Sequence, residues 1–184
     1  MREIIKFAFL SLSLVFSNCA FAETPDPLCW EYSNEIFKVS ILKSWRIKKN
    51  SFNVLHIDNL GSNGEAVSLS FNVARMSKEA DLFAKKISFK NDAFAEETAQ
   101  QVRNRFPDYK ILKHGPTTLG NFQAYFIEAE YSLNNLGSVW SLHSIQIYTI
   151  RNNFLSIIHF EGTKDYFKKK ESEFNLMISS FNYK

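Results

Sequence analysis

Histidine is the side chain most often used for proton transfer and metal binding near neutral pH. The sequence contains four, at His56, His114, His143 and His159. No two of them lie two or four residues apart, and the sequence has neither an H-E-x-x-H nor a C-x-x-C motif. The spacings that place metal ligands side by side are therefore missing. The four histidines are better interpreted as solvated residues, or as core residues with hydrogen-bond partners.

His143 and His159 could still approach each other in space, because they fall on two predicted strands joined by a tight turn. If Arg151 pairs with Phe154 across that turn, His159 faces Gln146. His143 then projects from the opposite side of the sheet. This register argues against a shared metal site, and no metal-ligating residue is predicted.

Other suggestive stretches have simpler interpretations. The segment 58–65 (DNLGSNGE) lacks the spacing of an EF-hand calcium loop and is predicted to be a hairpin loop. The basic run Lys168–Lys170, with Lys164 nearby, could touch anionic lipid or an acidic partner, although a solvated helix face is the simpler interpretation. The sequence has no G-x-S-x-G motif and no Ser/His/Asp order. No catalytic or cofactor-binding residue is predicted, and we do not expect an enzyme.

The first 22 residues have the three parts of a secretory signal peptide. A net positive segment, 1–6, precedes the apolar run 7–16, and Ala20-Phe21-Ala22 then forms an A-x-A cleavage site. Cleavage is predicted between Ala22 and Glu23, with export by the Sec route because no twin-arginine pair is present. The alternative is a buried N-terminal helix. No segment reaches the 20 or so apolar residues that span a bilayer, so no transmembrane segment is expected in the mature chain, which we place in the periplasm or outside the cell.

Two cysteines bear on export and on redox chemistry. A lipid anchor would require Cys19, but Asn18 precedes it, Phe16 stands where leucine is usual, and the A-x-A site follows directly. Cleavage after Ala22 is therefore favoured over lipidation. Cys29 is then the single cysteine of the mature chain, so an internal disulfide is impossible and a packed, small apolar side chain is expected.

The composition indicates one folded domain. The 184 residues are 45% hydrophobic and include 18 phenylalanines but only 6 glycines and 4 prolines, which excludes disordered and collagen-like chains. The net charge of +3 argues against nucleic acid as the main partner. A chain of this length can bury a sizeable core without a metal or a disulfide.

The hydrophobic pattern changes between period two and period 3.6 along the chain. Strands are predicted over 36–41, 45–48, 52–57, 67–73, 109–113, 122–131, 139–150 and 154–160, with a break at 114–116. Helices are predicted over 78–87, from a cap at Asn91 or Asp92 to about 105, and from 162 to about 179. Trp45 and Trp140 match the strand alternation and are predicted to be core residues, with partner contact as the alternative. The order predicts an α+β fold: a single layered domain with a central, largely antiparallel sheet flanked by helices.

Several passages resemble one superfamily. They are the strand-turn-strand passage 37–47, the helix end 105–112, the segment 115–125 (GPTTLGNFQAY) and the closing 178–181. In this order they resemble the PsbP-like domain superfamily, the fold type of PsbP, DcrB and Mog, over residues 35–184. Residues 23–34 are left as a lead-in. The resemblance implies an α/β/α sandwich and a non-enzymatic accessory role.

Together these observations predict an exported, non-enzymatic accessory or protein-binding domain of the cell envelope. Its partner would be an envelope protein or complex, and no cofactor is expected. The alternative is a carrier of a small apolar ligand held between the sheet and a helix, which the phenylalanine content suggests.

Overall fold

The computed structural model describes residues 28–51, 53–76, 93–135, 137–151 and 153–184, and the fold consists of two antiparallel sheets and two helices within these ranges. The small sheet has the order β1-β2-β10, and the large sheet has the order β3-β4-β5-β9-β8-β7-β6. The elements are β1 (Cys29–Ser33), β2 (Phe37–Leu42), β3 (Arg46–Ser51), β4 (Val54–Leu60), β5 (Ala66–Arg75), α2 (Ala93–Arg103), β6 (Lys110–Leu119), β7 (Phe122–Asn135), β8 (Ser138–Arg151), β9 (Phe154–Thr163), α3 (Lys164–Ser179) and β10 (Asn182–Tyr183). Every pairing between described strands is antiparallel, as predicted.

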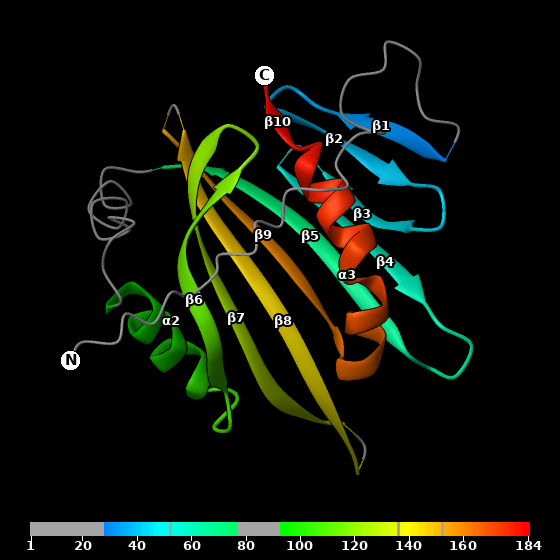
Figure 1. The fold of residues 1–184 in the computed structure, drawn as a ribbon, viewed down its shortest axis with the longest axis vertical. Helices are drawn as coiled ribbons and strands as arrows, with labels where there is room; N and C mark the ends of the chain where they lie inside the picture. The colour runs from blue at the N-terminus through cyan, green and yellow to red at the C-terminus, as the bar shows by residue number, and fades with distance from the viewer. Residues whose placement is uncertain (1–27, 52, 77–92, 136, 152) are drawn as a thin grey trace, which may run out of the picture.

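One face of the large sheet is covered by α3 together with the small sheet (Figure 1). The strand alternation explains this face, because Val67, Leu69, Phe71 and Val73 all project into the core and are at most 1% exposed. Phe167, Phe174, Ile178 and Phe181, which recur at helical spacing along one side of the last helix, are buried against them. Rings stack through the interface, including Phe160 on Phe174, with centroids 4.5 Å apart.

The opposite face of the large sheet is covered only in part by described elements. Helix α2 places Phe94 against Tyr125 and Tyr148 of β7 and β8, with edge-on ring contacts. Ala95 and Ala99 of this helix are also buried, on the same side as Phe94. Strands β4, β5 and β9 carry polar residues on this side.

The predicted sandwich is therefore correct only in part. The fold is α+β and its main sheet is antiparallel, but a second sheet rather than a second helix accompanies α3 on the packed face. The reason is that Tyr32 of β1 and Tyr183 of β10 add apolar surface to the core from the two ends of the described chain. The helix predicted over 78–87 lies outside the described residues.

Three local predictions were wrong. The lead-in 23–34 contains the strand β1, which pairs with β2 along its whole length. The break predicted at 114–116 does not occur, because β6 continues through it in register with β7. The loop predicted over 58–64 is shorter, because β4 runs to Leu60 and the turn is closed by the hydrogen bond from the Gly61 amide to the Glu65 carbonyl.

Candidate functional site

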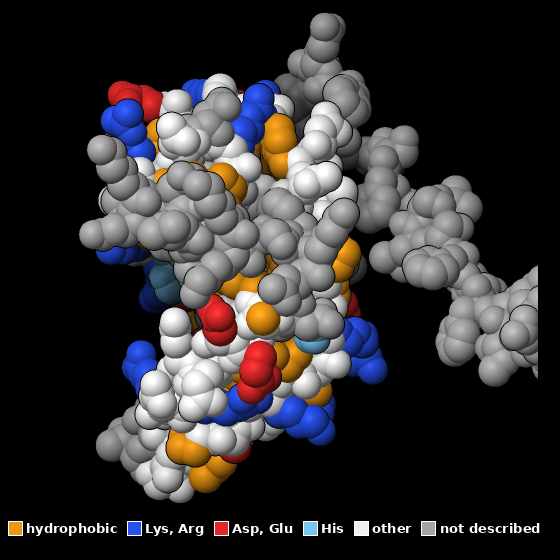
Figure 2. All heavy atoms as spheres, turned by 90° about the vertical axis from the view of Figure 1, so that its left-hand side faces the viewer, with side chains coloured by type: hydrophobic (Ala, Val, Ile, Leu, Met, Phe, Trp, Pro, Cys, Tyr) orange, Lys and Arg blue, Asp and Glu red, His pale blue; other side chains and the backbone are white. Residues whose placement is uncertain are grey.

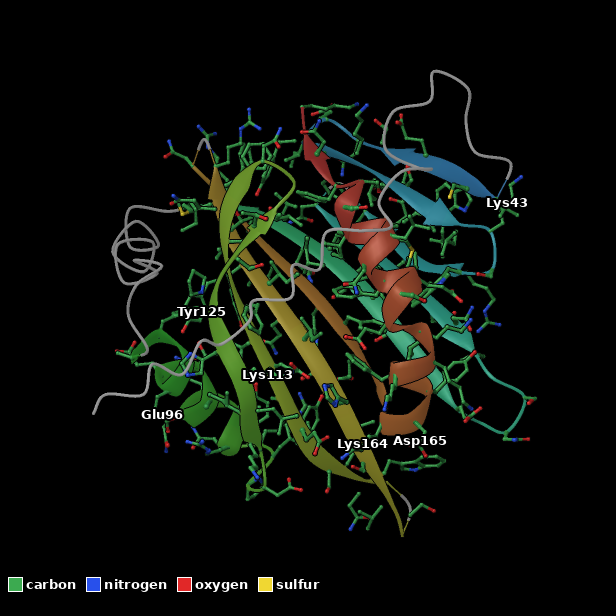
Figure 3. All side chains as sticks on the ribbon, viewed as in Figure 1. Lys43, Glu96, Lys113, Tyr125, Lys164 and Asp165 are labelled. Carbon is green, nitrogen blue, oxygen red and sulfur yellow. The ribbon has the colours of Figure 1, made fainter. Side chains whose placement is uncertain are left out.

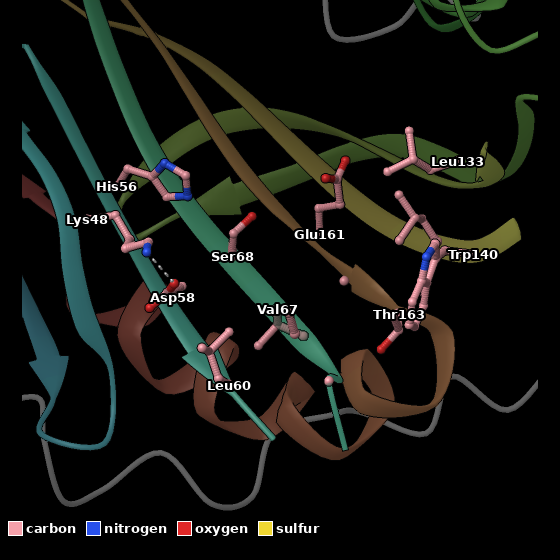
Figure 4. A pocket seen from close by; sticks show the side chains of 14 residues that line it. Lys48, His56, Asp58, Leu60, Val67, Ser68, Leu133, Trp140, Glu161 and Thr163 are labelled. Carbon is pink, nitrogen blue, oxygen red and sulfur yellow. Dashed lines mark ion pairs between the residues drawn. The ribbon is translucent and has the colours of Figure 1, made fainter. Parts of the chain in front are cut away.

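A groove of about 390 Å³ lies on the partly covered face of the large sheet (Figure 4). Its walls come from β3, β4, β5, β7, β8 and β9, so one continuous sheet surface forms the floor. Apolar side chains form both rims, with Leu60 on one side and Leu133 and Trp140 on the other. The volume lies within the range of small-ligand sites, and the mixed lining is typical of them.

Charged and hydroxyl side chains form a straight row across the groove floor. Strand register aligns Arg46 with Asp58, Asp58 with Ser68, Ser68 with Glu161, and Glu161 with Ser144. Neighbouring strands lie about 4.8 Å apart, so the Asp58 and Glu161 backbones, two strands apart, are separated by about 10 Å. The row therefore places two carboxylates on one floor in different surroundings.

Asp58 is held by two cations. It is 7% exposed, and Arg46 donates to it from Nε at 3.0 Å and from Nη2 at 3.2 Å. Lys48 Nζ lies 3.6 Å from Oδ2 of Asp58. Such a bidentate pairing of a buried carboxylate with arginine forms a structural ion pair. Asp58 is not available to a ligand.

Glu161 has no such partner. Tyr131 donates a hydrogen bond from its hydroxyl to Oε2, and burial raises the pKa of the Glu161 carboxyl against a smaller opposing effect of Arg105. The basic atom nearest to it is His159 Nε2, at 3.5 Å. Burial lowers the pKa of His159 to about 4, with a smaller contribution from His56, so this imidazole is uncharged at neutral pH. Glu161 is thus a half-buried carboxylate without a positive partner in contact among the described residues.

Three buried polar atoms without a hydrogen-bond partner among the described residues belong to sheet neighbours of Glu161. In the described part of the chain, the buried side-chain atoms of this kind are Tyr109 Oη, Ser144 Oγ, His159 Nε2 and Thr163 Oγ1. Ser144 is fully buried and lies directly opposite Glu161 on β8. His159 and Thr163 lie on β9 two positions before and after Glu161, on the same face of the sheet. Tyr109 lies farther away: its ring centroid is 5.7 Å from that of Tyr131, whose hydroxyl donates to Glu161. Burial raises the pKa of the Tyr109 hydroxyl to about 12. Buried polar atoms in native proteins are nearly always satisfied, so this cluster indicates a place for water or a polar ligand.

The four histidines occupy different surroundings. Arg151 pairs with Phe154 and His159 with Gln146, so the predicted register of the two strands is confirmed. His56, His159 and His114 fall on one row across the sheet, joined through Ser70, Gln146 and Ile127. His114 Nδ1 lies 2.7 Å from the hydroxyl of Tyr125. The sequence interpretation missed this row because it requires the register of six strands.

His143 lies on the other face of the sheet, as the register predicts. Its Nε2 is 2.9 Å from Glu128 and its Nδ1 is 3.3 Å from Glu130, and its ring packs on Phe167 with centroids 4.3 Å apart. The two carboxylates also pair with Lys113 and Lys164, which lie to either side of β7 and β8 (Figure 3). Within the described ranges, no group of three or more His, Cys, Asp or Glu is arranged to hold a metal ion.

The two tryptophans that were predicted to be core residues differ. Trp45 is 3% exposed, and its indole N–H donates to Glu173 at 2.7 Å. Trp140 is 41% exposed, so its prediction was wrong. It belongs to the face that α2 covers, but it lies at the end of β8 beyond that helix. Alternation along a strand identifies the face of a side chain and not whether anything covers that face.

The remaining predicted features are placed as follows. Cys29 is buried, as expected for a packed side chain, whereas Cys19 and the cleavage residues Ala20, Ala22 and Glu23 lie outside the described residues. In the basic run, Lys169 pairs with Glu65 and Lys170 with Glu173 on the outer side of α3. None of the helices in the described ranges has both the length and the apolar character needed to cross a bilayer.

Comparison with solved structures identifies the fold. The chain is similar to cyanobacterial PsbP (CyanoP) from Synechocystis sp. PCC 6803, with a TM-score of 0.60 and 15% identity over 90% of this chain and 98% of that one. LpqN, involved in cell envelope biogenesis of Mycobacterium tuberculosis, gives a TM-score of 0.54 and 11% identity over 80% of this chain and 82% of its own. The Ran-binding protein Mog1p of Saccharomyces cerevisiae gives 0.53 and 7% identity, over 84% of this chain and 94% of its own.

No protein-family model and no curated protein sequence matches the chain. The structural likeness therefore defines the fold alone. The chain has the PsbP-like fold, and the predicted resemblance is confirmed at that level.

Proposed function

We propose that this protein is an exported, non-enzymatic accessory protein of the cell envelope. It acts by binding another protein through the exposed end of the β7–β8 hairpin and the groove beside it. Export is inferred from the signal-like sequence of residues 1–22. LpqN, a protein of the same fold, is involved in cell envelope biogenesis, although that likeness concerns the fold only.

One observation supports binding above all: the hairpin patch, defined as Leu133, Val139 and Trp140. These side chains are 37%, 69% and 41% exposed, respectively. They lie where β7 and β8 end, at the lower end of the molecule, where Figure 2 shows hydrophobic side chains at the surface. Leu133 and Trp140 are paired on the groove face, and Val139 projects from the other face of the hairpin. An exposed tryptophan among aliphatic side chains is typical of the centre of a protein interface.

The alternative is a carrier that holds an apolar ligand between the sheet and a helix, but the interface between the large sheet and α3 is filled by packed side chains. Phe160 lies between Phe174 and Phe167, with ring centroids 4.5 Å and 4.3 Å away, respectively. The phenylalanine content that suggested a carrier is thus used for core packing on this face.

Site-specific photo-crosslinking in cells tests the proposal. A photoreactive residue in place of Val139 should give a discrete adduct with one envelope protein, and Trp140→Ala should remove that adduct. The control is the same photoreactive residue in place of Leu112, which is 38% exposed on β6 at the far edge of the sheet. Equal adducts from both positions, or none from Val139, would contradict binding through the hairpin patch.

Export is tested separately by the intact mass of protein recovered from the envelope. The mass expected is that of a chain beginning at Glu23. A chain that retains residues 1–22, or one with a lipid on Cys19, would contradict this part of the proposal.

A further inference from the structure

The groove contains one acidic group, Glu161, that has no cation in contact among the described residues. The two charged ends of its floor differ: Asp58 is neutralised by Arg46 and Lys48, whereas the described part of the chain gives Glu161 the Tyr131 hydroxyl and an uncharged His159 as polar neighbours. Withdrawing a carboxylate from water without a cation is costly. This cost is removed if a positive group enters the groove from outside.

The atoms around Glu161 are those that a cationic head group needs. An ammonium or guanidinium has several N–H donors and no acceptor. Among the described residues, Thr163 Oγ1, which lines the groove, and Ser144 Oγ, which is fully buried directly opposite Glu161, have no partner and can accept hydrogen bonds. The unprotonated ring nitrogen of the neutral His159 can accept one too. Glu161 supplies the charge and these neighbours supply the remaining acceptors.

The apolar part of the groove fits a long aliphatic stem. Leu142 and Thr163, which pair in register, lie between Glu161 and the rim, and Trp140 stands at the rim with Leu133 directly opposite it in register. An indole face beside a path to a carboxylate also attracts cations.

We propose that the groove binds a lysine or arginine side chain of the partner protein, with its charged head at Glu161 and its stem along Trp140 and Leu142. This inference rests on the proposed function and names the chemistry that the partner presents. The hairpin patch supplies the surrounding apolar contact, and Glu161 selects a basic residue at its centre. The other groups that face the carboxylate are His159, Arg105 and, further along the floor, His56 and Lys48.

Small probes of matched length test the inference on the intact protein. Hexylammonium, 1-hexanol and hexanoate share a six-carbon chain and differ in charge. We expect hexylammonium to move the NMR signals of the Trp140 indole N–H and the Ser144 amide, with hexanol binding about tenfold more weakly and hexanoate more weakly still. Glu161→Gln keeps the shape and an acceptor for Tyr131, and it should make hexylammonium and hexanol bind equally.

A matched acid provides the control. Glu173 is 27% exposed against 28% for Glu161 but lies on α3 on the other face of the sheet, so Glu173→Gln should leave the amine preference unchanged. Equal binding of hexylammonium and hexanol by the unaltered protein would overturn the inference, and so would the absence of any shift at Trp140 and Ser144.

The photo-crosslinking experiment separates this inference from the proposed function. If Glu161→Gln removes the adduct formed from position 139, both are supported. If the adduct persists in Glu161→Gln but is lost in Trp140→Ala, the protein binds through the hairpin patch and the inference of a basic residue is wrong. If Val139 gives no adduct while hexylammonium still selects Glu161, the site binds amines and the proposed protein partner is wrong.

Discussion

The two faces of the seven-stranded sheet are built from the same strands, but one face is packed against α3 and the other carries the groove. On the face that meets α3, Leu69, Phe71 and Phe160 are fully buried and aromatic rings stack in series. On the other face, the same strands place Ser68 and Glu161 toward a groove. Each strand alternates between the two faces, so neighbouring residues in the sequence belong to opposite environments.

The contrast shows where the fold obtains its stability and where it can bind. Apolar burial is the dominant favourable contribution to folding, and the α3 face contains most of it. The groove face contains a half-buried carboxylate and polar atoms without partners, each of which costs free energy. Groups that lower stability are retained where a ligand can satisfy them. Four changes would break or sharpen this contrast.

The largest effect is expected on the packed face. Phe174→Ala should lower the free energy of unfolding by about 3–5 kcal/mol, because the ring is 2% exposed and stacks on Phe160. Urea-induced unfolding followed by circular dichroism measures the change. A loss below about 1 kcal/mol would mean that this face does not dominate stability.

The second effect is pH-dependent and belongs to the groove face. The pKa of His159 is lowered from 6.5 to about 4 in the folded protein, so between these values the unfolded chain binds a proton that the folded one does not. The free energy of unfolding should therefore fall as pH falls from about 6.5 to about 4, by up to about 3 kcal/mol. Chemical denaturation across this range measures it.

Substitution isolates that contribution from its neighbours. Glu161, whose pKa burial raises, acts in the opposite direction, because a raised carboxyl pKa favours the folded state at low pH. His159→Gln removes only the imidazole. The variant should therefore lose less stability than the unaltered protein over the same pH range, and identical slopes would contradict the assignment.

A third, smaller effect should be stabilising. Ser144 is fully buried and its hydroxyl has no partner in the part of the chain that the structure describes, so Ser144→Ala removes a buried polar atom and no hydrogen bond seen there. We expect stability to rise by about 1 kcal/mol while binding of hexylammonium weakens. Thr149→Val serves as the control, because its hydroxyl donates to the Gln123 carbonyl at 2.8 Å and its loss should destabilise. A destabilised Ser144→Ala would show that its hydroxyl has a partner.

The smallest effect is expected on the outer side of α3. Lys169 is 61% exposed and pairs with Glu65 at 3.2 Å, so Lys169→Ala should change the free energy of unfolding by at most about 0.5 kcal/mol. Comparison with Phe174→Ala in the same helix tests the helical phase. Equal losses would show that the buried stripe is assigned to the wrong side.

The packed face was predictable because its information is local. Alternation at Val67, Leu69 and Phe71, and helical spacing at Phe167 and Phe174, identify the buried positions without knowledge of the partners. The short strands were not predictable in the same way. Asn182–Tyr183 becomes a strand only by pairing with Lys38 and Phe37, far away in the sequence.

The groove was less accessible to prediction, for a physical reason. The pairing of Arg151 with Phe154 fixes the register of β8 and β9, so His159 was correctly placed opposite Gln146. Glu161 meets Ser68 only through the pairing of β5 with β9, which no turn connects. Trp140 is exposed because it lies beyond the part of the sheet that α2 covers. Strand alternation contains no information on how far a helix covers the sheet.

The pairing of β10 with β2 has a consequence for the time course of folding. The Ser40 amide donates to Ser180 Oγ, 140 positions along the chain, and Phe37 stacks on Phe181. Contacts of such long sequence separation form slowly, because closing a large loop costs entropy before any contact is gained. We therefore expect the successive hairpins from β6 to β9 to assemble early and the aromatic core to close late. Until Phe181 docks, the chain remains open enough to be threaded through a narrow channel.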